Sequence, residues 1–286
     1  MKRLLLIVTV LIATGQAHAQ NWSLVWADEF NGTSLNLADW NHDLGTGSQY
    51  GLTGWGNNEL QYYRSENVEV SGGNLKISAL QENYMGMNYT SGKIHTKTKR
   101  FYTHGKIEAR MQVPTDQGMW PAFWMLTEPG DLAQNAASWP PELDIMETVG
   151  HTGNTTFGTA HYGTWPTVIS NGGQYTVPSG DLSSTFHTYT VEWYPDNIAW
   201  YFDGILIHEL NSTDVSPEAW QFNQDFFLIF NLAVGGSWPG SPDGSTTFPE
   251  EMLVDWVRVY SYDDTETTDV TFRVDMSEQT LAPTDI

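Results

Sequence analysis

The chain of 286 residues contains no cysteine. This absence excludes disulfide bonds, thiol chemistry and cysteine-ligated metal sites. Basic residues are also scarce: 12 Lys and Arg stand against 34 Asp and Glu, giving a formal net charge of −22 at pH 7. Such a surface repels nucleic acid and anionic membranes, so we expect neither as a partner. A neutral substrate suits this charge, whereas a sulfated polymer is disfavoured.

Several chemistry-bearing motifs are missing as well. The sequence has no H-E-x-x-H, G-x-S-x-G, P-loop or dinucleotide-binding fingerprint, and we expect no organic cofactor. It also has no stretch of useful length with helical periodicity. The chemistry and the fold must therefore come from other patterns.

The first nineteen residues have the three parts of a secretory signal peptide. Lys2 and Arg3 are basic, residues 4–13 are apolar, and Ala17-His18-Ala19 is an A-x-A cleavage site. The apolar run is too short to span a membrane. We therefore expect residues 1–19 to be removed and the mature protein to be secreted. Without disulfides, it needs a large core or a bound cation to hold its fold.

The rest of the chain reads as many short strands separated by turn signals. Asp203-Gly204, for example, is a two-residue hairpin turn between alternating segments. This pattern predicts an all-β sandwich of two antiparallel sheets. The expected strands lie within residues 22–30, 59–63, 68–70, 75–80, 89–100, 106–113, 142–149, 156–162, 186–194, 198–202, 205–208, 226–234 and 252–262.

Three other segments lie outside this regular pattern. Residues 45–58 are rich in Gly, Ser and Asn and predict an exposed loop. Residues 263–286 form an acidic linker and a tail too short for a second domain, which we expect to be disordered. The folded domain is therefore expected over residues 20–262.

The segment Pro141-Glu142-Leu143-Asp144-Ile145-Met146-Glu147 carries three carboxylates within six residues. Strand alternation puts Glu142 and Asp144 on one face but turns Glu147 into the apolar layer, where a lone carboxylate is costly. One extra residue, a β-bulge at Ile145–Met146, returns Glu147 to the acid face. We therefore predict a bulge in this strand.

With the bulge, Glu142 and Glu147 are separated by roughly 13 Å along the backbone. Retaining glycosidases need two carboxyl groups about 5–5.5 Å apart. Two long Glu side chains on a curved sheet can lean toward each other over Asp144. Spacing alone leaves an exposed acidic strand as an equal alternative.

The flanking motifs decide between these alternatives. The motifs WPAFW (120–124), SWPPELDIMETVGH (138–151) and GTAHYG (158–163) together closely resemble family 16 glycoside hydrolases, in particular the laminarinase branch with its inserted Met. The resemblance covers residues 21–262. It implies a β-jelly roll with a concave cleft, in a secreted, endo-acting, retaining β-glucanase that hydrolyses β-1,3 bonds of laminarin-like glucans. Two alternatives remain: a mixed-linkage glucan or agarose-type galactan hydrolase of the same fold, or a non-catalytic glucan-binding module.

The resemblance assigns Glu142 as the nucleophile and Glu147 as the acid/base. Physical reasoning adds a role for Asp144, which lies between them. It can hydrogen-bond the nucleophile, and its charge helps to keep Glu147 protonated.

The substrate-binding residues rest mainly on the same resemblance. Indole faces pack on pyranose rings, so we expect Trp120, Trp124 and Trp139 in the cleft and Phe123 in the core. His161 is expected near the cleavage point, and Lys93 stands where the family usually has Arg. The remaining expected contacts are Asn58, Glu59, Arg64 and Asn67 on the glycone side and Trp238 at the cleft edge.

The resemblance also implies a structural Ca²⁺ on the convex side. Its ligands would be the backbone carbonyls of Glu29 and Gly73 and the side chain of Asp255, and oxygen ligands suit calcium. We expect the partner to be a neutral β-glucan and the protein to be a monomer.

Overall fold

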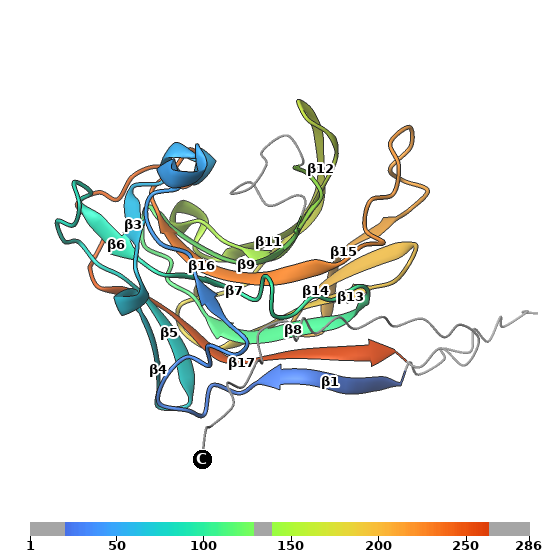
Figure 1. Cartoon of the computed structure of the whole chain (residues 1–286), viewed down its shortest axis with the longest axis horizontal. Helices are drawn as coiled ribbons and strands as arrows, with labels where there is room; N and C mark the ends of the chain where they lie inside the picture. The colour runs from blue at the N-terminus through green and yellow to red at the C-terminus, as the bar shows by residue number, and fades with distance from the viewer. Residues whose placement is uncertain (1–20, 129–138, 263–286) are drawn as a thin grey trace, which may run out of the picture.

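The computed structural model describes residues 21–128 and 139–262. The expected signal peptide and the acidic tail lie outside these residues, as does Ser138 of the tryptophan-rich motif. Figure 1 shows two sheets stacked face to face. No helix in the described ranges is long and apolar enough to cross a membrane.

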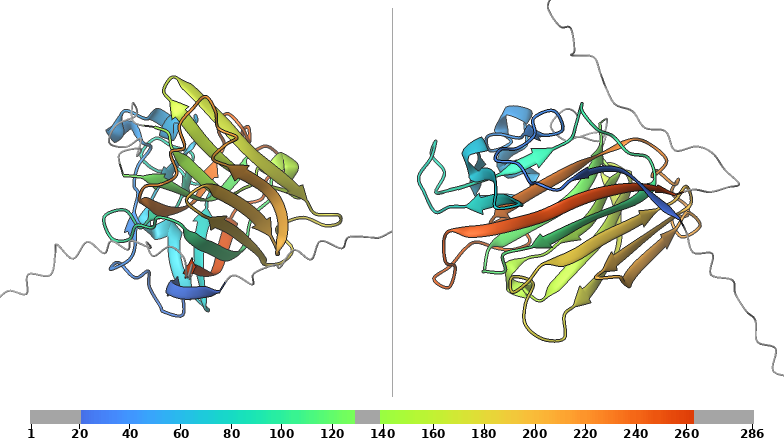
Figure 2. Two further views of the ribbon diagram at one scale, coloured as in Figure 1. Left: turned by 90° about the vertical axis from the view of Figure 1, so that its right-hand side faces the viewer. Right: turned by 90° about the horizontal axis from the view of Figure 1, so that it is seen from below.

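One sheet has eight strands and the other seven. The eight-stranded sheet runs β15-β14-β13-β8-β17-β5-β4, with β1 paired to β17. Its strands are β1 (Trp22–Asp28), β4 (Val68–Ser71), β5 (Asn74–Ala79), β8 (Gly105–Gln112), β13 (His187–Trp193), β14 (Asn197–Phe202), β15 (Ile205–Asn211) and β17 (Glu250–Tyr262). The right-hand view of Figure 2 shows β17, in red-orange, crossing the molecule beside β1.

The seven-stranded sheet runs β12-β11-β10-β9-β16-β7-β2. Its strands are β2 (Asn41–His42), β7 (Lys93–His95), β9 (Met119–Thr127), β10 (Glu142–Glu147), β11 (Thr155–Thr164), β12 (Thr167–Thr176) and β16 (Phe226–Val234). All pairings within the two sheets are antiparallel, which confirms the predicted sandwich. A small parallel pair, β3 (Gln61–Tyr63) with β6 (Tyr89–Ser91), lies beside them.

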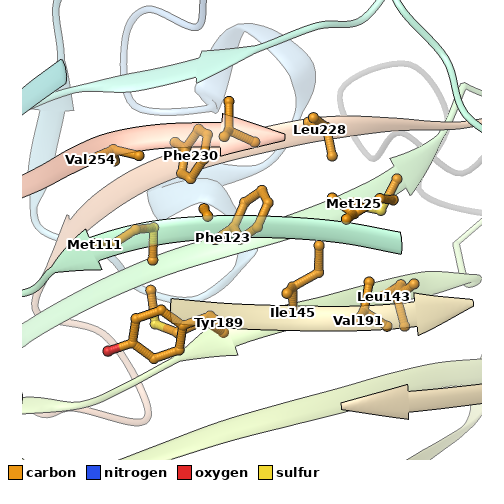
Figure 3. Packing of buried hydrophobic residues seen from close by; sticks show 14 of the residues in the cluster. Met111, Phe123, Met125, Leu143, Ile145, Tyr189, Val191, Leu228, Phe230 and Val254 are labelled. Atoms are coloured by element: carbon orange, nitrogen blue, oxygen red, sulfur yellow. The ribbon is translucent and has the colours of Figure 1, made fainter. Parts of the chain in front are cut away.

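The core fills the space between the two sheets. Strand β8 alternates buried and half-buried residues along its whole length, as a strand with one core face should. Phe123 of β9 stacks on Phe230 of β16, with ring centroids 4.4 Å apart and an interplanar angle of 11° (Figure 3). Phe123 is fully buried, so its predicted place in the core is confirmed.

The predicted hairpin at Asp203–Gly204 is confirmed between β14 and β15. Both turn residues have positive φ, 47° and 78°, as a tight hairpin requires. The sequence reading missed β12, because its central Asn171-Gly172-Gly173 reads as a turn. Those glycines instead sit where the sheet is crowded: a Cβ on Gly172 would lie 2.3 Å from the carbonyl oxygen of Gly158.

The expectation of an exposed loop over residues 45–58 is wrong in one important respect. Two short 3-10 helices form there, η1 (Ser48–Tyr50) and η2 (Thr53–Gly56), and Trp55 is buried. In Figure 1 this segment, in blue, rises at one end of the seven-stranded sheet, and β12 rises at the other. The outer face of this sheet is thus bordered at both ends.

Candidate active site

Strand β10 carries the three carboxylates at the middle of the seven-stranded sheet. Its pairing with β9 jumps from Asp144↔Trp124 to Met146↔Phe123, and its pairing with β11 shifts over the same residues. The predicted bulge is therefore confirmed. Ile145 and Met146 are both buried in the core, so Glu147 returns to the face of Glu142.

A cavity of about 710 Å³ lies over this face. Carboxylates and indole rings make up much of its lining. Its lining residues are Leu52, Trp55, Gly56, Asn57, Glu59, Tyr63, Lys93, Trp120, Ala122, Trp124, Leu126, Trp139, Glu142, Asp144, Glu147, Trp165, Asn231 and Ala233. A mainly apolar wall with a few convergent polar groups is typical of a small-molecule or sugar site.

Two of the cavity tryptophans also hold the outer carboxylates. Trp120 Nε1 donates to Glu147 Oε1 at 2.8 Å, and Trp139 Nε1 donates to Glu142 Oε2 at 2.9 Å. Each indole therefore fixes one acid while its ring forms part of the wall. Trp124 donates instead to Asn231 Oδ1, at 2.7 Å.

Both outer carboxyl groups have raised pKa values, for the same two reasons. Burial, and then the charge of Asp144, raise the pKa of Glu142 to about 7. The same two causes raise the pKa of Glu147 well above its usual value. Both outer carboxyl groups therefore hold a proton more strongly than free glutamate does, and the His161 charge and the Trp139 N–H oppose this rise at Glu142.

His161 lies against the acids from the neighbouring strand β11. Its Nε2 is 3.0 Å from Asp144 Oδ2 and 3.8 Å from Glu142 Oε1. Burial opposes its protonation, but its bond to Asp144 and the surrounding carboxylates raise its pKa to about 9. Asp144 Oδ2 thus lies against His161, whose positive charge lowers the pKa of Glu142. The expected hydrogen bond between Asp144 and Glu142 stays a prediction.

Lys93 forms part of the cavity wall through contacts that the sequence did not reveal. Its Nζ lies 4.2 Å from the ring centroid of Trp55 and 5.3 Å from that of Trp124. The same Nζ pairs with Asp43 Oδ2 at 3.1 Å. Burial opposes ionisation of Asp43, but Lys93 and His95 hold its pKa well below the usual range.

Glu59 lies in the cavity wall as expected, and neighbouring side chains hold it. Its Oε2 accepts from Gln61 Nε2 at 2.6 Å and from the Tyr63 hydroxyl at 3.0 Å. Burial raises its pKa despite these bonds. Asn57 contributes to the lining, whereas the predicted Asn58 donates to Ser237 Oγ at 2.9 Å.

The other predicted contacts lie further from the cavity. Trp238 packs edge-on against Trp120, with ring centroids 5.6 Å apart, and so supports that residue of the wall. Arg64 stacks on Tyr84 and pairs with Glu82 at 3.0 Å. Asn67 is buried and donates to the Ser78 carbonyl oxygen. Within the described part of the chain, neither Arg64 nor Asn67 is among the lining residues.

The expected calcium ligands come from neighbouring segments of the eight-stranded sheet. Val254 pairs with Leu75, and Asp28 pairs with Val257, so Asp255 lies between the chain segments that hold Gly73 and Glu29. A carboxylate and two carbonyls suit a hard cation. Asp255 Oδ2 is paired with Arg110 Nη1 at 2.6 Å, so a cation there would share this carboxylate with a guanidinium group.

Comparison with known proteins agrees with this geometry. The chain matches the model "Glycosyl hydrolases family 16" over residues 55–258. It is 38% identical over 282 residues to a β-glucanase of Rhodothermus marinus, covering 92% of this chain and 95% of that protein. It is 39% identical over 260 residues to glucan endo-1,3-β-glucosidase A1 of Niallia circulans, covering 83% of this chain but only 38% of that longer protein.

The fold has solved counterparts as well. The catalytic domain of the laminarinase from Thermotoga maritima MSB8 superposes with a TM-score of 0.79 at 40% identity, covering 85% of this chain and 100% of that domain. The sandwich, the inserted Met of β10 and the cavity over it thus occur together in a chain that is similar to these proteins along most of its length.

Proposed function

Because the chain belongs to glycosyl hydrolase family 16, we propose that this glycosidase is a secreted, endo-acting, retaining enzyme that hydrolyses β-1,3 bonds of laminarin-like glucans. The observation that carries the proposal is the pair of carboxyl groups of Glu142 and Glu147, which line an aromatic cavity and are each held by an indole N–H. Secretion rests on the signal-like residues 1–19. The exported protein should begin at Gln20, and an uncleaved N-terminus would contradict that part.

In the first step, an ionised Glu142 oxygen attacks the anomeric carbon, and the bond from that carbon to the leaving oxygen breaks. Glu147 donates its proton to the leaving oxygen, so the released sugar chain is neutral. The N–H groups of Trp139 and Trp120 hold the two carboxyl groups in place. The His161 charge favours the ionised form of Glu142.

In the second step, water attacks the anomeric carbon of the glycosyl–Glu142 ester. Glu147, now a carboxylate, accepts a proton from this water, and the ester bond to Glu142 breaks. The enzyme regains its starting protonation. Two inversions at one carbon leave the product with the β configuration of the substrate.

The same cavity supports the choice of substrate. A wall of indole rings suits the C–H faces of neutral pyranose units, and the acidic surface disfavours sulfated polymers. The chemistry uses side chains of this chain alone. The similar proteins named above include a laminarinase and an endo-1,3-β-glucosidase, which favours β-1,3 glucan over the other substrates of the fold.

The proposal is tested by incubating the protein with laminarin, barley mixed-linkage glucan and agarose. We expect laminarin to be cut fastest and to release oligosaccharides of mixed length, with β-anomers appearing first in proton NMR spectra. Faster cleavage of either other polymer would overturn the substrate. Release of glucose alone would contradict endo action, and initial α-anomers would contradict retention. Binding of laminarin without cleavage would favour a glucan-binding module.

We also propose that Glu29, Gly73 and Asp255 hold a structural Ca²⁺. A ligand at 100 times its Kd stabilises the folded state by about 2.7 kcal/mol, so saturating Ca²⁺ should raise the Tm by several degrees. Asp255→Asn should remove this increment, and Asp196→Asn, in a turn of the same sheet, should keep it. The readout is the Ca²⁺-dependent rise in Tm, because Asp255→Asn also breaks the pair with Arg110. An unchanged increment in Asp255→Asn would contradict the site.

A further inference from the structure

Trp165 stands at the tip of the hairpin that joins β11 to β12. Its side chain is 57% exposed, although an indole buries more apolar area than most side chains when a site for it exists. Thr164 and Thr167 flank the turn and are exposed too. Core packing therefore does not explain a tryptophan at this position.

The exposed ring nevertheless belongs to the cavity wall. Trp165 is one of the residues that line the cavity over Glu142. Its ring centroid lies 6.0 Å from that of Trp139 at an interplanar angle of 58°, and Trp139 donates to Glu142. An aromatic surface therefore continues from the carboxylate to the end of the hairpin.

The hairpin holds this ring in a defined place. The pairing of β11 with β12 runs without a break from Thr155↔Thr176 to Thr164↔Thr167. Near the tip, the Gly163 N–H donates to Gln221 Oε1 at 2.7 Å. Further down, Asn171 Oδ1 is 2.9 Å from His208 Nε2 of β15. These two bonds connect the β11–β12 hairpin to Gln221 and to β15. Little further ordering of its backbone is therefore needed when a ligand binds.

The position of the hairpin in the sheet separates Trp165 from Trp55 and Trp124, the aromatic residues around Lys93. In the sheet order, β12 and β7 lie toward opposite ends, with β10 between them. Lys93 of β7, with Trp55 and Trp124, forms the wall on one side of the acids, and Trp165 forms it on the other. A polymer that contacts both the Lys93 side of the wall and Trp165 must pass over Glu142 and Glu147.

We propose that Trp165 forms a distal sugar-binding subsite, on which a pyranose unit away from the reacting bond stacks its C–H face. The inference rests on the proposed function and adds to it a binding position outside the catalytic carboxylates. Its ligand is a neutral β-linked glucan chain long enough to reach from the acids to the hairpin tip. Short oligosaccharides do not reach it.

The test compares Trp165→Ala with the parent enzyme on a series of laminarin oligosaccharides of increasing length. Aromatic stacking corresponds to a three- to ten-fold effect, so kcat/KM on the longest oligosaccharides should fall about three- to ten-fold. The shortest oligosaccharide that the parent cleaves should be unaffected. Trp165→Phe should recover most of the loss. Ile205→Ala, which truncates an exposed apolar residue at the β14–β15 hairpin of the other sheet, should match the parent at every length.

The outcomes separate this inference from the proposed function. An inactive parent would overturn the function itself. An active parent with an unchanged Trp165→Ala variant would overturn only the subsite. An equal loss at all lengths would also overturn it, because Trp165 would then act on the reacting bond through Trp139 and Glu142.

Discussion

Glu147→Gln is expected to reduce hydrolysis of laminarin by about 10²–10⁴-fold, the usual contribution of general acid–base catalysis. Gln keeps the size of the side chain and can still accept from Trp120, but it cannot donate a proton to the leaving oxygen. An aryl β-glucoside with an acidic phenol needs no such proton. The first step on this aryl glucoside should therefore keep most of its rate in Glu147→Gln. The glycosyl–Glu142 ester should then accumulate, and its formation is measured as a burst of released phenol.

Glu142→Gln should lose activity on both substrates, because the neutral amide that replaces the carboxylate is too weak a nucleophile to form the ester. The contrast between the two variants distinguishes the nucleophile from the acid more sharply than either loss alone. Glu69→Gln, at an exposed position of β4, serves as the control and should match the parent. Equal losses on both substrates in Glu147→Gln would contradict its role as the proton donor. Full activity of Glu142→Gln would overturn the mechanism.

Lys93→Met should destabilise the fold by about 3–5 kcal/mol, the usual cost of breaking a buried ion pair from one side. It leaves the Asp43 carboxylate without the ammonium group 3.1 Å away. The double variant Lys93→Met, Asp43→Asn removes both charges and should recover much of the loss. Urea unfolding of the parent, both single variants and the double variant gives the coupling energy.

The loss of stability in Lys93→Met should depend on pH, because the pKa of Asp43 is lowered in the folded state. A carboxyl group of this kind contributes stability above its unfolded pKa, and that contribution is lost as the pH falls through its folded pKa. The difference between the parent and Lys93→Met should therefore be largest near neutral pH and shrink in strong acid. A difference that is independent of pH would show that Lys93 stabilises the cavity wall by packing alone.

The chemistry of β10 could be read from the sequence because it is local. Alternation, the cost of a carboxylate in the apolar layer and one residue too many between Asp144 and Glu147 together predicted the bulge, and the strand pairings confirm it. The antiparallel sandwich followed from strand length and turn signals in the same way. Both inferences depend only on patterns among residues that are close together in the sequence.

Other parts of the cavity could not be predicted because they are assembled from distant segments. Trp55, Tyr63, Trp165 and Asn231 line one cavity with Glu142, but only the order of strands in the sheet brings them there. Trp55 in particular stood in a Gly-rich stretch that resembles an exposed loop. Its isolated aromatic ring was the available signal, since a large apolar side chain in a polar segment needs a partner.

Arg64 and Asn67 were expected on the glycone side from the resemblance alone, and the structure places neither among the residues described as lining the cavity. Both follow β3, whose Tyr63 does reach the cavity. The chain then turns through η3 (Ser65–Asn67), and the Asn67 amide is used to bond Ser78 and Thr90. Their predicted contact with substrate remains a prediction that the cavity does not support.

The bulge in β10 also limits how the sheet can assemble. A regular strand can slide by two residues along its neighbours and keep every side chain on its own face, whereas a slide by one residue exchanges the faces. In β10 the register breaks against β9 and β11 both fall between Asp144 and Glu147, so a two-residue slide would also move the bulge away from the positions where both neighbours accommodate it. The strand therefore has one favourable alignment with its neighbours. Strand pairing alone can then place the three acids on the cavity face, in a chain that has no disulfides.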